Sequence, residues 1–89
     1  MKASCEISLY PLHENYKEVI IAFIQRIKKH KNIKVETNGL STQLFGDYDL
    51  IMDVIKVELK KVYEEHKAVL IFKMAKGERT RSKLPKILK

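Results

Sequence analysis

Residues 2–10 alternate between apolar and polar side chains along their whole length. The apolar set is Ala3, Cys5, Ile7 and Leu9. The polar set is Ser4, Glu6, Ser8 and Tyr10. This period of two predicts a strand with one face on a core, and Pro11 ends it. The polar face carries a carboxylate, two hydroxyls and a phenol, which suits either plain solvent exposure or a small polar-ligand site.

The pattern changes to a helical period after Pro11. Apolar side chains recur three and four residues apart between Tyr16 and Ile27, which predicts a helix with one apolar face. Asn15 is the expected N-cap, with Glu18 as its capping-box partner, and Asn32 is expected to end the helical segment.

A hairpin is expected next. Residues 33–37 and 41–45 form two short runs, separated by the turn pair Asn38-Gly39 and closed by Gly46. In this register Ser41, Gln43 and Phe45 share one face, and Thr42 and Leu44 share the other.

A second helix and a last strand complete the pattern. Apolar positions from Leu50 to Val62 follow a helical period, and Asp47 or Asp49 caps the helix. Residues 67–74 then form a strand whose apolar centre predicts burial on both faces, as in a sheet whose outer face meets a partner.

The predicted order is therefore β-α-β-β-α-β, the ferredoxin-like arrangement of the α+β class. It has an antiparallel four-stranded sheet with the strands of residues 2–10 and 41–45 at its centre and two helices on one face. The other face is left open, which favours a subunit interface. We expect one domain over residues 1–76 and a basic tail over residues 77–89.

Composition adds the charge distribution to this picture. The 89 residues are 45% hydrophobic and 33% charged, which is typical of one globular domain. The net charge is +7, and the tail holds five basic residues against one acidic. The longest apolar run has six residues, from Val19 to Ile24, so neither a membrane span nor a secretory signal is expected. These features predict a cytoplasmic protein.

Motifs for catalysis, metals and cofactors are missing from the sequence. It contains no phosphate-binding loop, no GxGxxG, no CxxC and no HExxH. The histidines His13, His30 and His66 lie at predicted helix boundaries, and Cys5 faces the core. We therefore expect no metal site, no cofactor and no enzymatic activity.

The hydroxyl pair Ser41-Thr42 opens a central strand. These hydroxyls either cap the preceding turn or point into the same groove as Ser8 and Tyr10. Both interpretations remain open on the pattern alone.

Two segments resemble a known family. Residues 6–12, Glu-Ile-Ser-Leu-Tyr-Pro-Leu, and residues 41–47, Ser-Thr-Gln-Leu-Phe-Gly-Asp, are similar to the YkoF-like thiamine/hydroxymethylpyrimidine-binding domain family. The resemblance covers residues 1 to about 76. It implies a ferredoxin-like domain that binds thiamine or its pyrimidine moiety non-catalytically, as a carrier, store or sensor. A single domain would associate, as a homodimer or homotetramer, through the open sheet face. The lysine-rich tail departs from this resemblance.

The expected ligand-binding residues fit an aminopyrimidine chemically. Glu6 can accept from its amino group or bond a protonated ring nitrogen, and hydroxyls suit either edge of the ring. Aromatic rings can stack on the ligand and face the thiazolium cation. The expected set is Glu6, Ser8, Tyr10, Ser41, Thr42 and Phe45.

Two alternatives stay open. The net charge and the basic tail are compatible with weak, salt-sensitive nucleic-acid binding. The strands lack the aromatic pattern of an RNA-binding sheet, which argues against specific recognition. In a purely structural oligomerisation domain, Glu6 would be buried at the interface and would need a partner such as Lys73 or Lys34.

Overall fold

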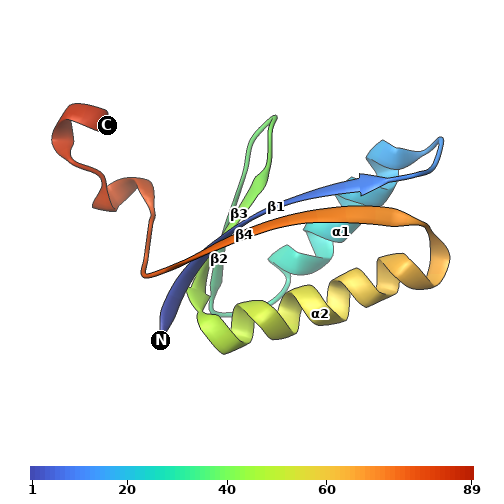
Figure 1. The fold of residues 1–89 in the computed structure, drawn as a ribbon, viewed down its shortest axis with the longest axis horizontal. Helices are drawn as coiled ribbons and strands as arrows, with labels where there is room; N and C mark the ends of the chain where they lie inside the picture. The colour runs from blue at the N-terminus through green and yellow to red at the C-terminus, as the bar shows by residue number, and fades with distance from the viewer.

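The order of helices and strands matches the predicted one. The computed structural model describes all residues from 1 to 89. Both helices lie on the same side of the sheet, and the tail leaves the end of the last strand on the opposite side (Figure 1). The elements are β1 (Lys2–Pro11), α1 (Tyr16–Lys28), β2 (Ile33–Thr37), β3 (Thr42–Asp47), α2 (Tyr48–Glu65), β4 (Ala68–Lys76) and the short 3-10 turns η1 (Arg81–Lys83) and η2 (Lys86–Leu88).

The sheet has the order β2-β3-β1-β4, so β1 and β3 occupy its centre as predicted. All three pairings are antiparallel. Glu6 lies opposite Gln43 on β3 and opposite Lys73 on β4. The register therefore confirms the predicted faces: Gln43 and Phe45 share the open face with Glu6, and Thr42 and Leu44 face the helices.

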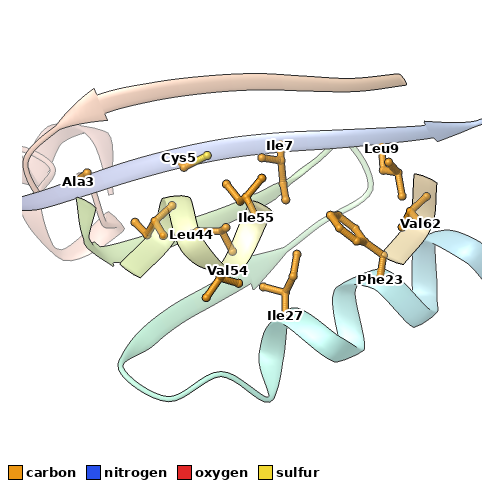
Figure 2. Packing of buried hydrophobic residues seen from close by; sticks show 11 residues of the cluster. Ala3, Cys5, Ile7, Leu9, Phe23, Ile27, Leu44, Val54, Ile55 and Val62 are labelled. Carbon is orange, nitrogen blue, oxygen red and sulfur yellow. The ribbon is translucent and has the colours of Figure 1, made fainter. Parts of the chain in front are cut away.

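The core lies between the sheet and the two helices. The apolar face of β1 is buried, and its side chains point toward α1 and α2 (Figure 2). Phe23 and Ile27 contribute the buried side of α1 to the same cluster. Burial raises the pKa of the Cys5 thiol to about 12, and the charge of Glu6 adds to this effect. The thiol therefore stays protonated at neutral pH and fills space in the core.

The two helices begin differently. Asp47 caps α2 as predicted, because its carboxylate accepts from the backbone amides of Asp49 and Leu50 at 3.1 and 3.3 Å. The predicted capping box of α1 is wrong. The Asn15 side chain makes no capping bond, because its backbone, at φ −90° and ψ 40°, lies outside the extended region that capping requires. The backbone amide of Asn15 donates to Nδ1 of His13 at 3.0 Å.

The hairpin between β2 and β3 is confirmed, with a different turn from the expected tight pair. The Asn38 carboxamide oxygen accepts from the amides of Leu40 and Ser41 at 2.8 and 3.2 Å, so residues 38–41 form the loop. The one non-glycine residue with a left-handed backbone is Asn32, at φ 68° after α1. The β3 strand also continues through Gly46, which was expected to close it.

Two predictions concern the open face. In the single chain the outer face of β4 is open, with Val69 and Ile71 50% and 58% exposed, so its predicted burial would need a partner and stays a prediction. Ser4 was expected to be presented on an uncovered face, yet it is only 8% exposed because the tail crosses it.

No helix has both the length and the apolar composition required to cross a bilayer.

Candidate functional site

Three hollows lie along the sheet, and the predicted site residues divide between two of them. The hairpin cavity, of about 320 Å³, lies among the end of β1, the loop of residues 38–41 and α1. The sheet-face hollow, of about 390 Å³, lies on the open face beside Glu6. The tail hollow, of about 420 Å³, is formed by residues at and after the end of β4.

The hairpin cavity holds four of the six predicted residues, namely Ser8, Tyr10, Ser41 and Thr42. The Ser41 and Thr42 hydroxyls point to opposite faces of the sheet, because Ser41 bonds Glu6 on the open face and Thr42 faces the helices, so the prediction that both hydroxyls enter one groove is wrong. Thr42 is buried, and its Oγ1 is 3.1 Å from Oγ1 of Thr37. Tyr10 also lines the cavity and is 52% exposed.

Glu6 is connected to this cavity through Ser41. The Ser41 hydroxyl donates to Oε2 of Glu6 at 2.9 Å, and Nζ of Lys73 lies 3.2 Å from Oε1. The hydrogen bond from Ser41, followed by the hydrogen bond and charge of Lys73, lowers the pKa of Glu6. Glu6 is therefore a carboxylate at neutral pH. Because the Ser41 hydrogen is used by Glu6, its oxygen is left to accept a bond from a ligand.

The side chain of Asn38 is a hydrogen-bond donor of the cavity that the sequence did not predict. Asn38 lines the hairpin cavity, and its carboxamide oxygen is occupied by two backbone amides. Its amide nitrogen makes no hydrogen bond within the chain and retains two donors. Together with the acceptor oxygen of Ser41, the amide of Asn38 gives the cavity both hydrogen-bond donors and acceptors. The Asn-Gly pair was visible in the sequence, but it indicated only a turn.

The lining of the hairpin cavity carries no charged side chain. Its apolar part includes the rings of Tyr16 and Phe23 from α1. The chain has a net charge of +7, yet no cationic side chain would touch a ligand in this cavity. The cavity therefore suits an aromatic ligand that is neutral or positively charged.

The sheet-face hollow has a different character. It is lined by Glu6 and Phe45 from the predicted set and by Lys73 and Arg79, two cations. Phe45 is only 5% exposed, so little of its ring is free for the stacking that was predicted. Lys73 pairs with Glu6, as one of the two alternatives proposed, while Lys34 pairs with Glu36 at 3.2 Å.

Arg79 enters the sheet-face hollow because Ser4 holds the start of the tail. The Ser4 hydroxyl donates to the carbonyl of Gly77 and accepts from the amide of Arg79, both at 2.8 Å. The Gly77 amide also donates to the carbonyl of Lys2 at 2.8 Å. Gly77 has φ +94°, a conformation that glycine adopts without strain. No local sequence signal indicated this contact.

The remaining titratable clusters lie away from these hollows. No group of three or more His, Cys, Asp or Glu side chains has a geometry able to hold a metal ion. The His13 and His66 rings meet edge-on, with centroids 4.9 Å apart. Between the helices, Glu58 is buried and pairs with Arg26 at 3.0 Å and His30 at 2.7 Å.

The sequence profile of the YKOF-related family matches residues 2–77. The chain belongs to this family. The match spans every helix and strand of the domain and stops where the basic tail begins. Among curated proteins, no sequence matches the chain significantly.

Solved structures share the fold. A protein from Streptococcus pneumoniae superposes with a TM-score of 0.80 at 24% identity, covering 89% of this chain and 90% of its own. A protein from Thermotoga maritima, provisionally assigned to thiamine biosynthesis or salvage, gives 0.79 at 24% identity, covering 92% of each chain. A hypothetical protein from Methanocaldococcus jannascii gives 0.75 at 28% identity, covering 90% of this chain and 84% of its own.

Proposed function

We propose that this protein binds thiamine or its hydroxymethylpyrimidine moiety in the hairpin cavity and releases it unchanged, as a carrier, store or sensor. The observation that carries the proposal is the uncharged, aromatic and hydroxyl-bearing lining of that cavity in a strongly basic chain. Family membership and the thiamine-related assignment of the Thermotoga maritima neighbour support the same ligand class.

The hydrogen-bonding groups match the edge of an aminopyrimidine. The exocyclic amino group donates to the Ser41 oxygen, whose own hydrogen is held by Glu6. The free amide donors of Asn38 bond a ring nitrogen. Tyr10 and Tyr16 offer aromatic surface to the pyrimidine or to the thiazolium cation. The carboxylate of Glu6 adds a negative charge behind Ser41 that favours a cationic ligand.

Non-catalytic binding accords with the chemistry of these groups. Neither a histidine nor a cysteine lines the hairpin cavity, and its polar groups are hydroxyls and an amide. None of these groups is a strong base or an activated nucleophile. Bound thiamine is therefore expected to be recovered intact after prolonged incubation with the protein.

Isothermal titration of thiamine and of hydroxymethylpyrimidine tests the proposal. We expect micromolar or tighter binding, weakened at least tenfold, or about 1.4 kcal/mol, in Glu6→Gln. The reason is that the substitution removes the negative charge, while the amide oxygen accepts only a weaker, neutral hydrogen bond from Ser41. Glu64→Gln, an equal change of charge at an exposed position of α2, is the control and should stay within twofold. Binding of thiamine to the wild type that is weaker than millimolar would contradict the proposal.

We also propose that the subunits associate through the open face of the sheet, as a homodimer or homotetramer. Tyr10 lies opposite Val69, and Ile71 lies two positions along β4, so three half-exposed side chains adjoin on this face. A second copy can cover this patch with the same patch, by two-fold symmetry. Sedimentation equilibrium over a range of protein concentrations is the test, and a monomer at every concentration would contradict the association.

A further inference from the structure

The tail hollow gathers cations that lack counter-charges. Lys76, Arg79 and Lys83 line it, against the single carboxylate of Glu78. Ion pairs elsewhere in the chain involve Arg26, Lys34, Lys61 and Lys73, and none involves a residue of the tail hollow. Like charges held around one hollow repel each other, and an anion between them removes this cost.

The hollow is held in place by the sheet. Ser4 accepts the amide of Arg79 and donates to the carbonyl of Gly77, so the backbone at Arg79 is fixed on β1. Nε of Arg79 donates to the carbonyl of Lys76 at 3.4 Å, which orients the guanidinium beside Lys76. The terminal nitrogens of Arg79 make no hydrogen bond within the chain and remain available as donors.

The donor set matches a phosphoryl group. A guanidinium presents parallel N–H bonds that bind two oxygens of a phosphate, and lysine ammonium groups add point charges. Three cations opposed by one carboxylate leave an excess of two positive charges in the lining of the hollow. A phosphate monoester or inorganic phosphate carries about −1.5 to −2 at neutral pH, which balances this excess.

We propose that Lys76, Arg79 and Lys83 of the tail hollow form a phosphoryl-binding site. Its occupant is inorganic phosphate or the phosphate of an ester. The inference is independent of the proposed function, because the tail hollow and the hairpin cavity share no lining residue. Arg79 also lines the sheet-face hollow with Glu6 and Phe45, whereas the hairpin cavity lies against the other end of β1.

Titration of the full chain at 150 mM KCl, close to physiological ionic strength, tests the site with three probes. They are inorganic phosphate, thiamine and thiamine monophosphate. We expect phosphate binding that weakens at least tenfold in Arg79→Gln and Lys83→Gln. Lys31→Gln removes the same charge at an exposed position beyond α1 and should stay within twofold. Equal losses in all three variants would reduce the effect to net charge and overturn the site.

The probes separate this inference from the proposed function. Phosphate binding without thiamine binding supports the site and contradicts the thiamine proposal. Thiamine binding with no response to phosphate, and no gain for the monophosphate, overturns the site and leaves the thiamine proposal intact. Thiamine binding that persists in Arg79→Gln, while the binding of phosphate and of the monophosphate through its phosphate is lost, supports both. Binding of an RNA oligonucleotide that depends on Arg79, without phosphate binding, overturns the site in favour of a nucleic-acid surface.

Discussion

The hairpin cavity and the tail hollow are built against opposite ends of β1, and they differ most in charge. The cavity uses Ile7 to Pro11 and carries no charged side chain. The tail hollow is fixed through Lys2 and Ser4 and carries three cations and one carboxylate. The net charge of +7 therefore describes neither site. Because salt screens charges beyond about 8 Å at physiological ionic strength, the local lining decides which ligand each site accepts.

The two regions also differ in how they are supported. The hairpin cavity rests on side chains that belong to the core, such as Ile7 and Phe23. The tail hollow depends on a few hydrogen bonds between the tail and the polar face of β1. A change in the core should thus affect the first site strongly and the second only through global unfolding.

Phe23→Ala is expected to have the largest effect, because the ring is 1% exposed and lines both the core and the hairpin cavity. We expect a loss of about 3–5 kcal/mol in the free energy of unfolding, measured by urea denaturation. Ile21→Ala, on the exposed side of α1, is the matched control and should cost less than about 1 kcal/mol.

The same substitution tests whether the hairpin cavity and the tail hollow are independent of each other. In the folded protein at low temperature, Phe23→Ala should lose thiamine binding and retain phosphate binding. Phe23→Leu, which keeps most of the buried volume, provides a second folded protein for this measurement. Equal loss of both ligands in folded Phe23→Leu would show that the sites are not independent.

Glu58→Gln is expected to have an intermediate effect that leaves both sites unchanged, because Glu58 lines none of the three hollows. Burial alone would raise the pKa of Glu58, but hydrogen bonds from His30, Arg26 and Lys61 outweigh it, and the pKa is lowered. Loss of the charge-assisted bonds should cost about 1.5–3 kcal/mol at pH 7.

The pH dependence of this contribution follows from the lowered pKa. The stabilisation is complete above the unfolded pKa of about 4.3 and is lost as the pH falls through the folded pKa. The urea midpoint of the wild type should therefore approach that of Glu58→Gln as the pH falls from 5 to about 3. A constant difference between the two proteins over this range would contradict the assignment of the charge network to Glu58.

Ser4→Ala is expected to have the smallest effect on stability, about 0.5–1.5 kcal/mol, because one hydroxyl joins the tail to β1. It removes no charge, yet it should weaken phosphate binding severalfold by releasing Arg79, and leave thiamine binding unchanged. Ser8→Ala is the control for phosphate binding, because its hydroxyl bonds only the carbonyl of Leu40, at 3.4 Å. Unchanged phosphate affinity in Ser4→Ala would show that the tether does not position the site.

The fold could be predicted because its determinants are local. The alternation in residues 2–10 fixes which side of β1 enters the core, and register then brings Glu6 beside Gln43. The predicted register put Ser41 on one face with Gln43 and Phe45 without pairing it with Glu6, and the structure adds a hydrogen bond between Ser41 and Glu6 across 35 positions of the chain. The burial of Glu58 could also have been predicted from the helical period, because this residue follows Val54 by four positions on the buried side of α2.

The rest of the candidate site could not be predicted, because it depends on contacts between distant segments. Ser4 and Gly77 are 73 positions apart, and neither residue type indicates a partner. Polar residues on a strand face are usually solvated, so burial of Ser4 by the tail leaves no periodic signal. Arg79 could not be assigned to the sheet-face hollow without that contact.

The position of β4 has a consequence for how the chain acquires its structure. The central strand β1 is made first, but its partner along nine residues, Ala3 to Pro11, is β4, beginning at Ala68. During synthesis, β1 must therefore wait with one edge unpaired until most of the chain has emerged. Such distant pairing slows folding relative to a helical bundle of equal length, and leaves the nascent chain dependent on the α1 and hairpin segments to shield its first strand.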